Sequence, residues 1–209
     1  MKKITIALIM VISLIAPIQT MAESVTQNGT IIEPLEQNIE QIIDEITSEP
    51  RPINSDAIQN VKEYISEYFG NLGYDNIEYQ KFEYNDENNE NAIRHSSQAD
   101  VFLASTAEDA IVDGIGENII VTKNSSIDTT KNLIISAHYD SAEDSVGAND
   151  NGSGVAAVLE LARILKDTEM PYNVKFILFS GEEKYMLGSR WYVGNLSEDE
   201  RKQIIGVIN

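Results

Sequence analysis

The sequence contains no cysteine. Disulfide bridges, thiol nucleophiles and cysteine metal ligands are therefore excluded, as is a lipid-modified N-terminal cysteine. The fold must be stabilised by its hydrophobic core, by bound metal, or by both. Two local motifs are also missing, the G-x-x-x-x-G-K-[ST] phosphate loop and the G-x-S-x-G nucleophile elbow. The acidic residues from Asp140 to Glu143 do not have the spacing of an EF-hand calcium loop.

Basic residues are few, with 15 Lys and Arg against 34 Asp and Glu, which gives a formal net charge of −19. This balance argues against binding to nucleic acid or to an anionic membrane through bulk electrostatics. We interpret the acidity as a source of solubility. The composition is 42% hydrophobic and 23% charged, which is typical of a soluble globular protein, and 209 residues predict one domain with at most a small extension.

The first 22 residues differ from the rest of the chain. Lys2 and Lys3 are followed by an apolar run over Ile4–Ala16, and Thr20-Met21-Ala22 has small residues at the positions that determine cleavage. This pattern predicts a secretory signal peptide. The alternative is an uncleaved anchor, but the run is shorter than the roughly 20 residues of a spanning helix. We therefore expect a secreted protein, extracellular or periplasmic, that is not attached to a membrane.

The chain after the signal peptide is predicted to comprise an N-terminal helical segment, 23–54, and one larger domain, 55–209. Apolar residues follow helical spacing over 31–47, and Ser55 is a suitable N-cap for a helix over 56–69. Residues 76–84 alternate as in an amphipathic strand. The polar stretch 86–100 predicts an exposed loop or hairpin, in which His95 is more easily explained as a surface residue than as a metal ligand.

Strands and helices alternate in the second half of the chain. Strands are predicted over 118–122, 133–137, 174–180 and 204–209, with helices over 152–166 and 186–193 and a capping box at Ser197–Glu200. This order predicts an α/β fold with a mostly parallel sheet and helices on both faces. In such sheets, ligands bind beyond the carboxyl ends of the strands.

One imidazole and three carboxylates follow two of these predicted strands. His138 and Asp140 end the strand 133–137, and Glu182 and Glu183 follow the strand 174–180. His138 and Asp140 are two residues apart and share one face of an extended segment, so Asp140 can orient a metal-bound imidazole. An H-x-D triplet at a strand end also arises by chance, and an acidic pair can be an ordinary loop. Their combination at one sheet edge favours a metal site.

A fourth carboxylate, Asp150, lies between them on a glycine-rich loop. Its two oxygens can bridge two metal ions about 3.5–4 Å apart. Asp150 could also cap the helix that begins near Gly152, which needs no metal, and the two roles are compatible. Adjacent side chains such as Glu182 and Glu183 diverge in an extended chain, so one can ligate a metal while the other transfers a proton. Histidine with carboxylates suits zinc, cobalt and manganese.

The run from LIISAHYDS through GANDNGSGVAAVLELARIL to VKFILFSGEEKYMLGSRWYV resembles the M28 family of zinc-dependent aminopeptidases. The resemblance implies two zinc ions and peptide or protein N-termini as substrates. It implies that His138 ligates the first zinc, Asp150 bridges both and Glu183 ligates the second. Glu182 would be the general acid and base, Asp140 would orient His138, and the peptide bond after Asp150 could be cis.

The resemblance also implies an aspartate ligand just after the Val207-Ile208-Asn209 segment and a later histidine ligand. Without them each zinc has two protein ligands, whereas a catalytic zinc normally has three. The sequence therefore predicts the N-terminal part of a peptidase domain, with weak zinc binding and little activity of its own. Two alternatives remain: a glutaminyl-cyclase-like acyltransferase of the same architecture, and a non-catalytic remnant or interaction module.

Overall fold

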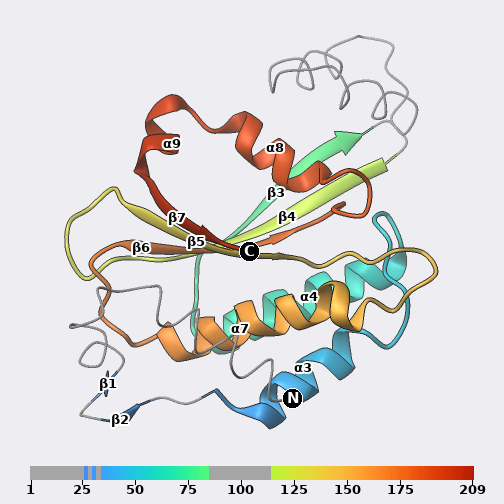
Figure 1. Cartoon of the computed structure of the whole chain (residues 1–209), viewed down its shortest axis with the longest axis horizontal. Helices are drawn as coiled ribbons and strands as arrows, with labels where there is room; N and C mark the ends of the chain where they lie inside the picture. The colour runs from blue at the N-terminus through green and yellow to red at the C-terminus, as the bar shows by residue number, and fades with distance from the viewer. Residues whose placement is uncertain (1–25, 28–29, 32–33, 85–113) are drawn as a thin grey trace.

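The structure, a computed structural model, describes residues 26–27, 30–31, 34–84 and 114–209 (Figure 1). The predicted signal peptide and the predicted loop over 86–100, with His95, lie outside the described residues. The described chain begins with two short antiparallel strands, β1 (Thr26–Gln27) and β2 (Thr30–Ile31). In the part of the chain that the structure describes, no helix has both the length and the apolar character needed to cross a membrane.

A five-stranded sheet forms the centre of the molecule, with strand order β3-β4-β6-β5-β7. Its strands are β3 (Ile77–Tyr84), β4 (Gly114–Lys123), β5 (Asn132–His138), β6 (Asn173–Phe179) and β7 (Ile204–Ile208). The predicted strands are thus all present, with bounds that differ by a few residues.

The predicted α/β fold class is confirmed, and the sheet has a parallel part and an antiparallel part. Strands β6, β5 and β7 are parallel, whereas β3 pairs antiparallel with β4, and β4 pairs antiparallel with β6. The physical reason is the connection between β4 and β5, residues 124–131, which contains no helix. A parallel connection needs a crossover of a dozen or more residues, so this short loop reverses the chain direction.

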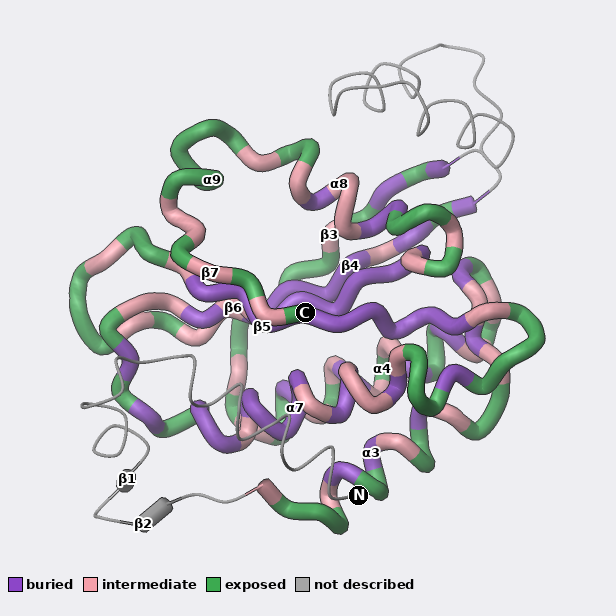
Figure 2. The backbone as a smooth tube through the Cα atoms, viewed as in Figure 1, coloured by how far each residue is buried: buried purple, intermediate pink, exposed green. Residues whose placement is uncertain are grey.

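Helices cover both faces of the sheet, as predicted (Figure 1). On one face lie α3 (Glu36–Ile46), α4 (Asp56–Asn71) and α7 (Ser153–Leu165), and on the other α8 (Leu187–Asn195) and α9 (Glu198–Gln203). The main core lies between the sheet and the helices α3, α4 and α7. The central strands, which lie between the two helical layers, are buried along most of their length (Figure 2). The N-terminal helix α3 contributes Ile39, Ile42 and Ile46 to this main core.

Helix ends follow local capping in two cases and a tertiary contact in a third. Ser55 Oγ accepts a hydrogen bond from the Ile58 N–H (3.2 Å), and Ser197 forms the predicted capping box with Glu200. Helix α3 begins at Glu36 rather than near residue 31. The reason is that Leu35 is extended and its N–H donates to Glu160 Oε1 of α7 (2.8 Å), a contact that sequence spacing cannot reveal.

Candidate metal centre

The site is placed by two adjacent parallel strands. Strand β5 ends at His138 and β6 ends at Phe179, and these two residues are directly paired in the sheet. The next peptide continues the register, because the Tyr139 N–H donates to the Phe179 carbonyl (2.9 Å). The turn after each strand therefore begins at the same edge of the sheet. This is the arrangement that the sequence predicted for the imidazole and the acidic pair.

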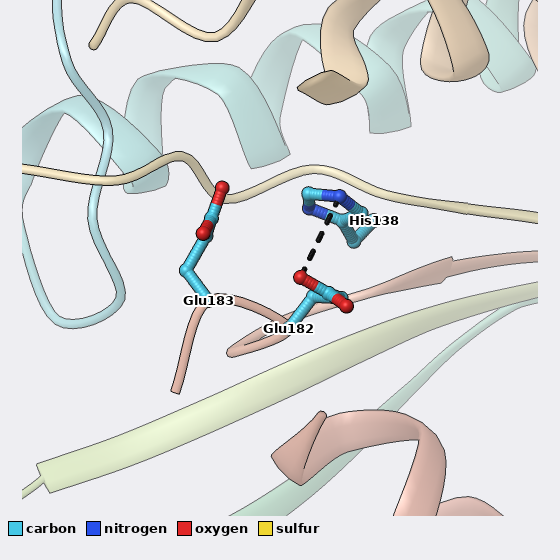
Figure 3. Close-up of side chains that lie close together, drawn as sticks. All are labelled: His138, Glu182 and Glu183. Carbon is cyan, nitrogen blue, oxygen red and sulfur yellow. Dashed lines mark ion pairs between the residues drawn. The ribbon is translucent and has the colours of Figure 1, made fainter. Parts of the chain in front are cut away.

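Three of the predicted site residues form one compact group (Figure 3). His138, Glu182 and Glu183 each offer a ligand atom, and these atoms all lie within 4.8 Å of one another. His138 Nε2 lies 3.8 Å from Glu182 Oε2 and 2.9 Å from Asp150 Oδ1. Asp150 and Glu182 are thus brought to a single imidazole nitrogen, although they and His138 come from three separate segments.

Asp140 lies behind His138 and is fully buried, with 0% of its surface exposed. Its Oδ1 is 3.5 Å from His138 Nδ1, and its backbone carbonyl is 3.2 Å from the same nitrogen. The carboxylate also accepts the N–H groups of Glu182 and Glu183, each at 3.1 Å. Asp140 therefore joins the two strand ends, a function that the sequence did not indicate.

The loop that carries Asp150, labelled η1 (Ala148–Gly152), has non-helical backbone angles at Asp150 and Asn151 and a cis peptide bond between them. The additional role of Asp150 as a helix cap is not observed. The first-turn N–H of Gly154 in α7 donates instead to Asn151 Oδ1 (3.1 Å). The side chain of Asp150 is 74% exposed and its Oδ1 faces His138, so it is accessible to a ligand from solvent.

The charges of this cluster favour a cation. Burial alone lowers the pKa of His138, but hydrogen bonds and charge from Asp140, Asp150 and Glu182 outweigh it and raise the pKa to about 9. Burial and the negative charges of Asp150, Asp140 and Glu182 raise the pKa of Glu183, while His138 opposes this. The carboxylates thus repel one another and stabilise positive charge between them. Imidazole nitrogen with carboxylate oxygen is a donor set that zinc accepts, so the residues present fit this metal.

Arg51, between α3 and α4, is the component of the site that the sequence analysis missed. It is fully buried and contacts the segments around Tyr139 and Gly147. In the sequence it stands alone between Pro50 and Pro52, more than 80 residues before the motifs that it contacts. No local pattern marks it, and only its burial in the folded chain reveals it.

A sequence model of peptidase family M28 matches residues 118–209, which include every site residue except Arg51. This segment belongs to peptidase family M28. The resemblance inferred from the sequence around His138, Asp150 and the pair Glu182 and Glu183 is thereby confirmed. Aminopeptidase YwaD of Bacillus subtilis is 43% identical over 95 residues, which are 45% of this chain and 21% of that protein. The chain thus spans about a fifth of the length of this curated relative.

Two solved structures share the fold. A zinc aminopeptidase from Bacillus subtilis, BSAP, superposes with a TM-score of 0.67 at 19% identity, covering 83% of this chain and 68% of that one. A glutaminyl cyclase from Porphyromonas gingivalis gives a TM-score of 0.58 at 18% identity, with 78% of this chain and 54% of that one covered. At these identities the likeness concerns architecture alone, and both a peptidase and a cyclase are built on it.

Proposed function

We propose that this chain carries the metal-binding and proton-transfer groups of a zinc-dependent aminopeptidase, which removes N-terminal residues from peptides. The observation that supports it most is the convergence of His138, Asp150, Glu182 and Glu183 at the carboxyl ends of β5 and β6, within the segment that matches family M28. In this proposal His138 and Asp150 would hold one zinc ion, and Asp150 and Glu183 would hold a second.

Zinc, when bound, would supply Lewis-acid activation of water and of the scissile carbonyl. The remaining chemistry falls to Glu182. Its carboxylate is partly exposed and lies beside His138 (Figure 3), where it can take a proton from the attacking water and return it to the leaving amine. The backbone of Glu182 is held by Asp140 (3.1 Å), so the turn that presents this carboxylate is anchored to the end of β5.

The ligand set has a consequence for affinity. The three proposed ligands give each of two zinc ions two protein donors, one fewer than the three of most catalytic zinc sites. We therefore expect the isolated chain to bind zinc weakly and to turn over substrate slowly. Titration of the metal-free protein with zinc in a calorimeter measures this directly, and tight stoichiometric binding together with rapid turnover would contradict it.

We also propose that residues 1–22 direct secretion and that the mature chain begins at Glu23, followed by the helical segment to residue 54 and the peptidase domain over 55–209. Expression in a secreting host, followed by N-terminal sequencing of the released protein, tests the cleavage site. Retention of the intact N-terminus in a membrane fraction would instead support the anchor alternative.

The substitution Glu182→Gln tests the proposed mechanism. It keeps the shape of the side chain but removes the proton acceptor, so we expect hydrolysis of leucine- or alanine-anilide at saturating zinc to fall by about 10²–10⁴-fold, with zinc affinity little changed. Glu143→Gln, on the exposed loop after Asp140, is the matched control and should retain the wild-type rate.

Two outcomes would favour the other functions. If the zinc-saturated wild-type protein hydrolyses anilides no faster than Glu182→Gln, the chain is a non-catalytic module. If it cyclises peptides with N-terminal glutamine but does not cleave anilides, the acyltransferase alternative, whose architecture this chain shares, replaces the aminopeptidase.

A further inference from the structure

Arg51 is an unusual residue for the interior of this protein. Its exposed fraction is 0%, although arginine is rarely buried completely unless it is paired. It lies in the connection between α3 and α4, outside the segment that matches family M28. Burial of a guanidinium for packing alone would destabilise the fold, because the desolvated charge must be compensated by groups within the protein.

The contacts of Arg51 converge on the two segments that carry the proposed metal ligands. Its Nε donates to the Tyr139 carbonyl (2.7 Å), its Nη1 to the Val146 carbonyl and its Nη2 to the Gly147 carbonyl (3.1 Å). Its backbone N–H donates to Ser141 Oγ (2.9 Å), and its carbonyl accepts the Ser141 N–H (3.2 Å). One residue thus bonds to both the His138–Asp140 segment and the loop that leads to Asp150.

The loop is held at a carbonyl that has two partners. Gly147 O accepts from Arg51 Nη2 and also from the Gly152 N–H (2.8 Å), so it joins the guanidinium to the far end of η1. Gly147 has a φ of 59°, and a Cβ there would lie 2.5 Å from the Asp150 carbonyl and 3.3 Å from Arg51 Nη2. The space beside the Gly147 Cα is therefore filled, and the loop has little room to shift while Arg51 is in place.

The charge of Arg51 is matched by the site itself. Burial lowers the pKa of Arg51, and the negative charges of Asp140 and Glu183 oppose that shift. The planar guanidinium, with five N–H donors in a fixed fork, can bond several carbonyls at once, which a lysine ammonium does less well. The positive charge of the buried Arg51 thus offsets part of the negative charge of the carboxylates at the proposed metal centre. Its guanidinium bonds to backbone carbonyls and leaves the proposed ligand atoms free to bind metal.

We infer that Arg51 is a positioning residue that fixes the Gly147–Asp150 loop against the end of β5 and so sets Asp150 opposite His138. Its relevance to zinc rests on the function proposed above, whereas its effect on the loop does not. The connection between α3 and α4 then belongs to the metal centre, although it contributes no ligand. Substitution of residues that support metal ligands typically lowers metal affinity by about 10–100-fold.

The effect on the loop is tested without metal. Amide hydrogen exchange is compared for the metal-free wild type, Arg51→Met and the control Arg163→Met. Arg163 pairs with the buried Glu160 (2.8 Å) at the opposite end of α7, so its loss also removes a charged hydrogen bond in the interior. We expect exchange of the Gly152 amide to be at least about tenfold faster in Arg51→Met and unchanged in Arg163→Met.

The effect on zinc is measured by calorimetry with the same proteins. Arg51→Met should raise the zinc Kd by at least about tenfold, and Arg163→Met should leave it within twofold of wild type. The visible spectrum of the cobalt(II)-loaded protein, which reports coordination geometry, should change only in the Arg51 variant. Where Arg51→Met does not fold, Arg51→Lys keeps the charge but loses the fork, and the same comparisons apply to it.

The outcomes separate the two proposals. If the wild-type protein binds no zinc, the proposed function is wrong, and the exchange experiment alone decides the role of Arg51. If the Gly152 amide exchanges equally in the Arg51 and Arg163 variants, the positioning role is overturned, whatever the zinc affinity. Faster exchange with unchanged zinc affinity would also overturn it, because the loop position would then not matter to the metal.

Discussion

At the scale of single residues, Asp140 contributes more to this protein than an H-x-D motif suggests. The motif predicts only that its carboxylate orients His138. In the structure the same carboxylate accepts two backbone N–H groups from the turn that carries the acidic pair, one on each oxygen. These bonds join chain segments that are remote in sequence, so no local pattern reports them. The relative position of His138 and Glu182 therefore depends on Asp140 even when no metal is bound.

The substitution Asp140→Asn tests this dependence. The asparagine amide keeps one acceptor oxygen for one of the two backbone N–H groups. Its NH₂ group would face the other backbone N–H, so two buried donors would meet without an acceptor. We expect the free energy of unfolding of the metal-free protein to fall by about 1–3 kcal/mol, measured by urea denaturation. Asp144→Asn, on the exposed loop that follows, should stay within about 0.5 kcal/mol of wild type. Equal stability of the two variants would show that the hydrogen bonds from the Glu182 and Glu183 N–H groups contribute little to the free energy of unfolding.

At the scale of helices and strands, most elements could be predicted because they depend on local patterns. The spacing of Ile39, Ile42 and Ile46 gives α3 an apolar face that packs into the core, and Ser55 and Ser197 cap their helices through neighbours a few residues away. The pairing of strands is different. Strand β6 lies between β4 and β5, and whether β4 runs parallel or antiparallel depends on a connecting loop and on tertiary packing. Strand order is for this reason poorly encoded in local sequence.

The turn η1 is the element on which the site depends most, and Gly147→Ala tests it. A Cβ at position 147 would lie 2.5 Å from the Asp150 carbonyl and 2.7 Å from Ser141 Cβ. The left-handed conformation adds a cost of about 1–2 kcal/mol for a residue with a side chain. We expect unfolding at a urea concentration well below that of wild type, and a weaker affinity for zinc.

Gly194→Ala is the matched control for that substitution. Gly194 lies in α8, and an added Cβ would meet nothing within 4 Å. Alanine in a helix is favoured over glycine by about 0.5–1 kcal/mol, so this variant should be slightly more stable than wild type, with the same zinc affinity. A shift in the same direction for both variants would indicate that the packing around Gly147 is looser than described.

At the scale of the whole molecule, the proposed ligands tie together parts of the fold that are far apart in sequence. His138 ends β5, Glu183 follows β6 and Asp150 precedes α7, while Arg51 connects the loop to the α3–α4 segment. The ligand-bearing motifs could be recognised from the sequence because each is short and contiguous. Their common location could be inferred from the carboxyl ends of parallel strands. The support from Asp140 and Arg51 could not, since it consists of long-range contacts to backbone groups.

Because the ligands span these elements, zinc should stabilise the fold as a whole. A ligand that binds only the native state at 100 times its Kd adds about 2.7 kcal/mol to the free energy of unfolding. We expect that increase in urea denaturation at matched protein concentration, and its reversal by a chelator.

Glu183→Gln should abolish most of the stabilisation by zinc. The metal-free variant should be no less stable than wild type, because burial and the neighbouring carboxylates, which raise the pKa of Glu183, both disfavour a charge at that position. A variant that responds to zinc as strongly as the wild type would exclude Glu183 from the ligand set.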